Sequence, residues 1–225
     1  MAIATYKDLC IDAVDAAAMG RFWAAALRLD LQVDDDGDAR LTGPTPRHTV
    51  WLNTVPEPVT VKQRMHLDVR ADSIDDLVAL GGVVVDAESF EHWTVMKDVE
   101  GGELCVFATR AGKPAGLMEI VVDTADASRI CAWWAGVLGA EAHDHEDGYS
   151  YVEPVPGAPF ESLVFVPVPE PKTVKNRIHI DVTTPDVQLL LDAGATLLRA
   201  RDDEIRWNVL ADPDGNEFCA FAQTD

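Results

Sequence analysis

Two histidines stand in nearly the same surroundings, one in "VKQRMHLDVR" at residues 61–70 and one in "VKNRIHIDVT" at residues 174–183. Polar and apolar residues alternate through both stretches, which is typical of a strand with one buried face. The polar residues that share a face are Arg64, His66 and Asp68 in the first stretch and Arg177, His179 and Asp181 in the second. A histidine in such a setting can ligate a metal, move a proton or belong to a self-contained polar network.

Tryptophans and cations near these strands are candidates for ligand binding. Trp51, Trp93 and Trp207 lie in or beside expected strands, where an indole ring can stack on a flat ligand or pack in the core. Arg64 and Arg177, together with Lys62 and Lys175, bring positive charge beside the histidines. These cations can hold an anionic group of a ligand or pair with Asp68 and Asp181.

The chain has four cysteines, at positions 10, 105, 131 and 219, and no two of them form a CxxC pair. This spacing does not resemble a disulfide framework or a zinc ribbon. We therefore expect reduced thiols, most of them buried as small apolar side chains.

The composition restricts the partners of the protein. The 225 residues include 18 Lys and Arg against 39 Asp and Glu, a formal charge of −21, which would repel nucleic acid and anionic membranes. The apolar stretches are shorter than the ~20 residues needed to cross a bilayer, and no secretory signal is readable at the N-terminus. We expect a cytoplasmic protein, a monomer or a homodimer, whose partner is a small molecule.

The sequence repeats itself. "EPVTVKQRMHLDV" at 57–69 and "EPKTVKNRIHIDV" at 170–182 agree at 9 of 13 positions, and "WTVMKDVEGGELCVFA" at 93–108 aligns with "WNVLADPDGNEFCAFA" at 207–222. The second alignment places Cys105 over Cys219. Two homologous domains are therefore predicted, at residues 1–112 and 113–225.

Each repeat reads as strand, helix and three strands, followed by the same order again. The first helices carry an aspartate cap, Asp15 or Asp126, and end near Leu27 and Leu138. The second helices follow the histidine strands directly, and "DVEGGE" and "DPDGNE" form the last tight turns. The predicted fold class is α+β, with two tandem domains that are each built from two βαβββ halves forming an open curved sheet.

Three segments resemble a known family: "DAAAMGRFWAAAL" at 15–27, "DASRICAWWAGVLGAE" at 126–141 and "DPDGNEF" at 212–218. They are similar to the first helix and the terminal hairpin of the vicinal oxygen chelate superfamily, also called glyoxalase/bleomycin resistance/dioxygenase, in its tandem glyoxalase-like subgroup. The resemblance implies that the two halves of each domain curl into an open barrel whose concave side holds the ligand.

The resemblance also implies four metal-ligand positions in each domain, which family enzymes usually fill with His and Glu. The first-strand position falls on Asp8 and Glu119, the second-half position on His66 and His179, and the last-strand position on Cys105 and Cys219. In the fourth position only Asn53 offers a ligand atom. Alternation along the first strand places Asp8, Cys10 and Asp12 on one face and Lys7, Leu9 and Ile11 on the other.

Neither repeat therefore keeps the usual His/Glu set. Two trios remain as metal-site hypotheses for Zn, Fe, Mn or Ni: Asp8, His66 and Cys105 in the first repeat, and Glu119, His179 and Cys219 in the second. Because thiols replace carboxylates that suit hard metals, a site without a metal cofactor is favoured.

Two functions follow from these alternatives. In the first, the protein binds a small organic molecule in its barrel concavities without a metal. In the second, it is a metal-dependent lyase, isomerase or dioxygenase in which Glu119 or Asp8 moves a proton. A third, weaker hypothesis is that side chains fill the cavities and the protein serves assembly.

Overall fold

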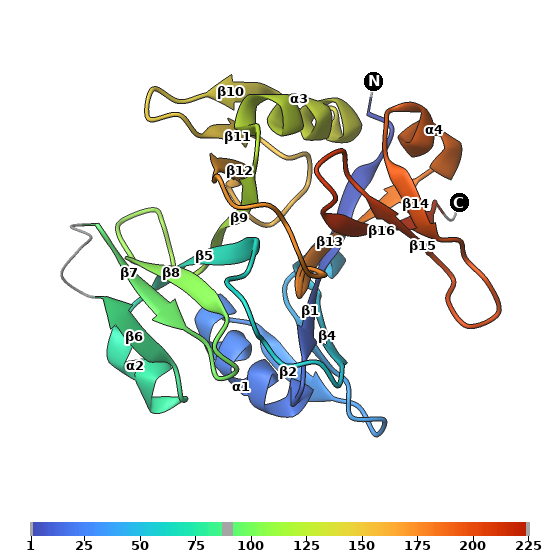
Figure 1. The fold of residues 1–225 in the computed structure, drawn as a ribbon. Coiled ribbons are helices and arrows are strands. Elements are labelled where there is room, and N and C mark those ends of the chain that lie inside the picture. Colours follow the sequence, from blue (N-terminus) through green and yellow to red (C-terminus); the bar gives the residue numbers. More distant parts are fainter. Residues whose placement is uncertain (1, 87–91, 224–225) are drawn as a thin grey trace.

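The computed structural model describes residues 2–86 and 92–223, which form an α+β fold of strands and short helices (Figure 1). Residues 5–108 form β1 (Thr5–Ala13), α1 (Ala16–Leu27), β2 (Asp30–Val33), β3 (Ala39–Thr42), the 3₁₀ helix η1 (Pro46–His48), β4 (Val50–Thr54), β5 (Met65–Ala71), α2 (Ile74–Ala79), β6 (Val83–Asp86), β7 (Trp93–Lys97) and β8 (Glu103–Ala108). Residues 116–222 form β9 (Gly116–Thr124), α3 (Ala127–Leu138), β10 (Ala142–Asp144), β11 (Ser150–Val152), β12 (Ser162–Pro167), β13 (Ile178–Thr184), α4 (Val187–Asp192), β14 (Thr196–Arg199), β15 (Asn208–Ala211) and β16 (Glu217–Ala222). None of the helices in these described ranges is long and apolar enough to cross a membrane.

The strands form two open sheets of eight strands each. Sheet A has the order β14-β15-β16-β13-β1-β4-β3-β2, and sheet B has the order β10-β11-β12-β9-β5-β8-β7-β6. The predicted fold class, α+β with tandem domains made of βαβββ halves, is confirmed. The boundary predicted between residues 112 and 113 lies in the loop between β8 and β9 and stays a prediction.

The pairing of the halves differs from what the resemblance implied. Sheet A joins the first half of the first repeat to the second half of the second repeat, and sheet B joins the two remaining halves. In each sheet the two halves meet through an antiparallel pair of strands, β1 with β13 and β5 with β9. The two chain ends consequently lie on the same side of the molecule (Figure 1).

Two arginines bind the connectors, which are the segment from β4 in sheet A to β5 in sheet B and the segment from β12 in sheet B to β13 in sheet A. Arg64 donates from Nη1 to the backbone carbonyl of Glu170 at 2.7 Å, and Arg177 donates to the carbonyl of Glu57. Each arginine therefore holds the connector of the opposite repeat. Sequence similarity could not reveal this exchange, because homologous halves bury similar apolar faces in either pairing.

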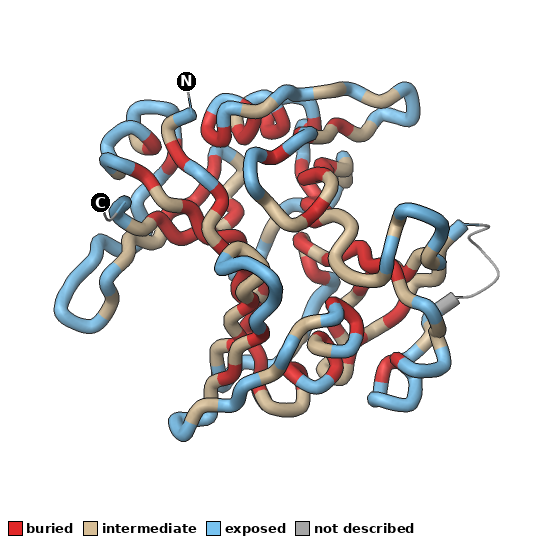
Figure 2. Tube along the Cα trace, turned by 180° about the vertical axis from the view of Figure 1, so that it is seen from behind, coloured by how far each residue is buried: buried red, intermediate tan, exposed pale blue. Residues whose placement is uncertain are grey.

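The helices α1 and α3 form as the sequence predicts. Asp15 accepts a hydrogen bond from the backbone N–H of Ala18 at 2.8 Å, and Asp126 accepts one from Arg129 at 3.1 Å. Both helices end in a left-handed residue immediately after Leu27 or Leu138. Their inner faces bury large aromatic rings against the sheets, and the buried residues follow the helices and the central strands (Figure 2).

The alternation predicted for the histidine strands is also confirmed. Met65, Leu67 and Val69 are buried in the core, which leaves His66 and Asp68 on the opposite, concave face of sheet B. The face predicted for Lys7 is wrong, because a β-bulge between Tyr6 and Asp8 interrupts the alternation of β1. Lys7 therefore lies beside Asp8, with 2.5 Å between Nζ and a carboxylate oxygen.

Candidate functional site

The exchange of halves regroups the predicted ligands. Asp8 on β1 lies in the same sheet as His179 on β13 and Cys219 on β16, whereas Glu119 on β9 lies with His66 and Cys105. The two trios predicted within single repeats are therefore wrong as groups. The physical reason is that β1 and β9 pair with the histidine strand of the other repeat, β13 and β5 respectively.

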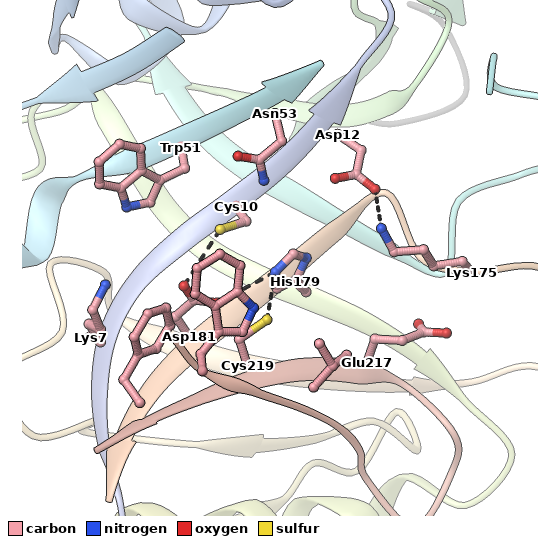
Figure 3. A pocket seen from close by; sticks show the side chains of 13 residues that line it. Lys7, Cys10, Asp12, Trp51, Asn53, Lys175, His179, Asp181, Glu217 and Cys219 are labelled. Atoms are coloured by element: carbon pink, nitrogen blue, oxygen red, sulfur yellow. Dashed lines mark hydrogen bonds and ion pairs between the residues drawn. The ribbon is translucent and has the colours of Figure 1, made fainter. Parts of the chain in front are cut away.

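Four buried side chains form a polar cluster at the bottom of the concave face of sheet A (Figure 3). Cys10 Sγ donates to Asp181 Oδ2 at 3.6 Å, and Cys219 Sγ lies 3.4 Å from His179 Nε2. His179 Nε2 also lies 3.4 Å from Asp181 Oδ1, although this contact lacks hydrogen-bond geometry and Asp181 Oδ1 has no other partner. We call Cys10, His179, Asp181 and Cys219 the polar floor.

Burial disfavours charge on the side chains of the polar floor. It raises the pKa of the Cys10 and Cys219 thiols well above the usual range, and nearby carboxylates add to this effect. Burial and the neighbouring Asp8 carboxylate likewise raise the pKa of Asp181, while burial lowers the pKa of His179 to about 4. These shifts favour the neutral, hydrogen-bonding forms of the four groups.

A cavity of about 380 Å³ lies above the polar floor. Trp51, Trp207 and Phe221 form its aromatic walls, and the rings of Trp207 and Phe221 stack with centroids 5.3 Å apart. Trp51 is held by a 3.1 Å hydrogen bond from its Nε1 to Asp8. The Lys7 ammonium lies 4.2 Å from the centre of the Phe221 ring. Trp51 and Trp207, two of the three predicted stacking residues, thus line one cavity.

The equivalent face of sheet B is more aliphatic. The strand registers place Val121 where sheet A has Cys10, Val164 where it has Trp51, and Val166 where it has Asn53. The histidine motif is repeated: His66 Nε2 lies 3.8 Å from Cys105 Sγ and 3.4 Å from Asp68. The third predicted tryptophan, Trp93, stacks on Phe107 in this sheet, with centroids 5.8 Å apart.

Glu119 occupies the place in sheet B that Asp8 occupies in sheet A. Its carboxylate accepts a hydrogen bond from Ser162 Oγ at 2.8 Å. Burial raises the pKa of Glu119, which favours its protonated form. Glu119 is thus placed to exchange a proton on this face, and its catalytic role stays a prediction.

The predicted pairing of the cations with Asp68 and Asp181 is wrong. Lys62 pairs with Asp123, Lys175 with Asp12 at 2.5 Å, and Arg177 with Glu100 at 2.8 Å, while Arg64 donates to a backbone carbonyl. These cations lie on the connectors, just before each histidine strand, and each of them contacts a residue of the other repeat. Within the described residues, Lys175 alone of the four lines the cavity of sheet A.

Among residues 2–86 and 92–223, two groups of side chains have donor atoms close enough to hold a metal ion. They are Cys10, His179 and Asp181 in sheet A, and His66, Asp68 and Cys105 in sheet B, with donor atoms within 4.8 Å of one another in each group. A set of thiol, imidazole and carboxylate fits zinc better than a hard oxygen-seeking metal. Sequence reasoning missed Cys10 as a donor, although alternation had already placed it on the face of Asp8.

Comparison with known proteins adds the family context. A family described as "Glyoxalase-like domain" matches residues 8–107 and again residues 119–221. No curated protein matches the chain in sequence.

Solved structures resemble the whole chain in fold. Glyoxalase I from Zea mays is similar with a TM-score of 0.70 and 14% identity, over 96% of this chain and 92% of that one. A putative dioxygenase from Bacillus subtilis is similar with a TM-score of 0.65 and 11% identity, over 100% and 86%. At these identities the likeness concerns the fold alone.

Proposed function

The chain belongs to the glyoxalase-like domain family, with one family domain in each half of its sequence, and on this premise we propose that it binds a small, flat organic molecule in the cavity of sheet A. The observation that carries the proposal is the combination of aromatic walls with an uncharged polar floor. A mostly apolar cavity with a few convergent polar groups is typical of small-molecule sites.

Different residues of the cavity would contact different parts of the ligand. Trp51 and Trp207 offer their ring faces to a flat ligand, which gains apolar contact and stacking. The carboxyl of Asp181, whose protonated form burial favours, and the neutral imidazole of His179 offer hydrogen bonds to a ligand hydroxyl or carbonyl. Lys7 and Lys175 stand at the rim, where each is already paired with an aspartate. The site therefore favours an uncharged ligand with one polar end.

Calorimetric titration with 2-naphthol, a neutral planar probe, tests the proposal. At roughly 0.5 kcal/mol for each of its about eleven heavy atoms, the probe should bind with a dissociation constant near 100 μM. We expect saturable binding of about one probe per chain. The proposal fails if 2-naphthol, indole and quinoline all give no saturable heat under the same conditions.

A second candidate function is supported by the convergent donor atoms. Cys10, His179 and Asp181 would hold a zinc-like ion in sheet A, and His66, Asp68 and Cys105 would do so in sheet B. Such an ion would polarise a ligand oxygen as a Lewis acid, which is the chemistry a lyase, isomerase or dioxygenase of this fold would need. In sheet B, Glu119 would then accept or return the proton.

Metal content separates the two candidates. Because thiols replace the expected carboxylates and Cys10 and Cys219 are engaged with Asp181 and His179, we expect no stoichiometric metal after incubation with excess zinc and dialysis. Elemental analysis of the purified chain measures this. About one zinc per donor group, with the zinc of sheet A lost in Cys10→Ser and both zinc ions retained in Cys131→Ser, would support the metal-dependent candidate instead. Cys131 is a suitable control because it is buried on α3, outside both donor groups.

A further inference from the structure

A second cavity, of about 480 Å³, lies where the halves of the two sheets meet. Its walls come from the start of β1, the end of α1, the segment around η1, β5, the start of β9 and the loop before β12. The lining residues used below are Tyr6, Arg28, Arg47, Arg70, Leu117 and Phe160. This cavity shares no lining residue with the cavity of sheet A.

Positive charge gathers in this second cavity, although the chain carries −21 overall. Arg70 is almost fully buried and binds Glu161 through two hydrogen bonds of 2.7 and 3.1 Å. The same carboxylate also binds Lys113 at 2.7 Å, so this trio retains a net positive charge. Arg28 is neutralised by Asp72 at 2.6 Å.

Arg47 is the cation that remains available. Among the described residues it pairs with no carboxylate, and its Nη1 donates to the carbonyl of Pro156 at 3.1 Å. Gly157, with a φ of +75°, lies so close that a Cβ there would stand 2.6 Å from Arg47 Nη1. The loop around Gly157 therefore packs directly on the guanidinium and holds it at the cavity wall, which lowers the entropy lost on binding.

Tyr6 supplies a second unused donor. Its side chain lines the cavity, the residue is 2% exposed, and its hydroxyl makes no hydrogen bond within the described part of the chain. The ring is fixed edge-on against Phe160, with centroids 5.1 Å apart. Burial raises the pKa of the Tyr6 phenol, so that it remains a donor. In the cavity, a ligand oxygen or a water molecule can accept the hydrogen bond that this hydroxyl offers.

We propose that this second cavity binds a small organic oxyanion, a carboxylate or phosphate on an apolar body. The Arg47 guanidinium and the Tyr6 hydroxyl hold the oxygens, because a charge-assisted hydrogen bond from Arg is the strongest kind available here. The apolar body packs against Leu117 and Phe160. The site is separate from the cavity of sheet A, so it stands independently of the proposed function.

Calorimetry on the full chain at low salt, with benzoate and phenyl phosphate as probes, tests this site. We expect at least one of them to bind and neutral benzamide not to bind. The tighter of the two probes identifies the anion as carboxylate or phosphate. Arg47→Gln should weaken binding roughly ten- to a hundredfold, and Tyr6→Phe should weaken it severalfold without loss of fold. Arg21→Gln, which changes an exposed arginine of α1 outside the cavity, should leave the affinity unchanged.

Three results would overturn the proposal. The first is the absence of binding of either anion below about 10 mM. The second is wild-type affinity in both Arg47→Gln and Tyr6→Phe. The third is a loss of anion binding in Trp51→Val with none in Arg47→Gln, which would locate the probe in the cavity of sheet A. Thermal unfolding of each variant confirms that the fold is retained.

Discussion

Replacement of Trp51 by valine is expected to weaken binding of 2-naphthol by roughly 30- to 70-fold. The indole forms one wall of the cavity of sheet A, and its loss removes both apolar contact and ring stacking, together about 2–2.5 kcal/mol. Valine is the residue that the chain itself carries at the equivalent place of sheet B, Val164, so the change is compatible with this strand position. Calorimetric titration of the variant measures the effect.

The matched control is Trp93→Val in sheet B. Trp93 occupies the place there that Trp207 occupies in sheet A, and its ring stacks on Phe107 away from the cavity. This variant should bind 2-naphthol as the unaltered chain does. Equal losses in Trp51→Val and Trp93→Val would show that the probe does not depend on the cavity of sheet A.

Arg177→Met is expected to lower the free energy of unfolding by about 3 kcal/mol. The Arg177 guanidinium binds the Glu100 carboxylate at 2.8 Å, and both side chains are largely buried, with 11% and 12% exposed. Glu100 in turn accepts hydrogen bonds from the backbone N–H groups of Val14 and Asp15. Methionine keeps the approximate length of the side chain but leaves Glu100 without its positive partner.

Arg64→Met provides the internal comparison. Arg64 stands at the equivalent place in the first repeat, but it donates to the carbonyl of Glu170 and, within the described residues, has no carboxylate partner. Its loss should cost about 1.5 kcal/mol, the lower end of the range for a hydrogen bond that involves a charged group, because this contact is exposed. Urea unfolding followed by circular dichroism measures both variants. Equal losses of unfolding free energy would mean that the Glu100 contact does not stabilise the pairing of halves from different repeats.

Local structure was predictable because it depends on residues close in sequence. The aspartate caps at Asp15 and Asp126 satisfy backbone N–H groups three residues away, and strand alternation placed His66 and Asp68 opposite Met65 and Leu67. The bulge at Lys7 escaped prediction, since alternation is the only signal in that strand and a bulge interrupts it.

The candidate site was predictable residue by residue but not as a group. His179, Cys219 and Trp207 do lie on one concave face, yet Asp8, Cys10 and Trp51 join them from the other repeat. Spacing within a repeat carries no information on which copy of a strand will be the neighbour. The connector contacts that accompany the pairing involve backbone carbonyls, at Glu57 and Glu170, which no residue pattern reveals.

The pairing of halves also sets the order in which the protein can fold during its synthesis. Sheet B consists of a continuous stretch, from β5 to β12, whereas sheet A needs β1–β4 and β13–β16, which are separated by that entire stretch. At the usual speed of a ribosome, β13 emerges roughly 6–25 s after β4. Only then can β1 pair with β13. Closing so long a loop is entropically costly and slow. We therefore expect sheet B to be completed first and the cavity with the aromatic walls to be the last part of the molecule to form.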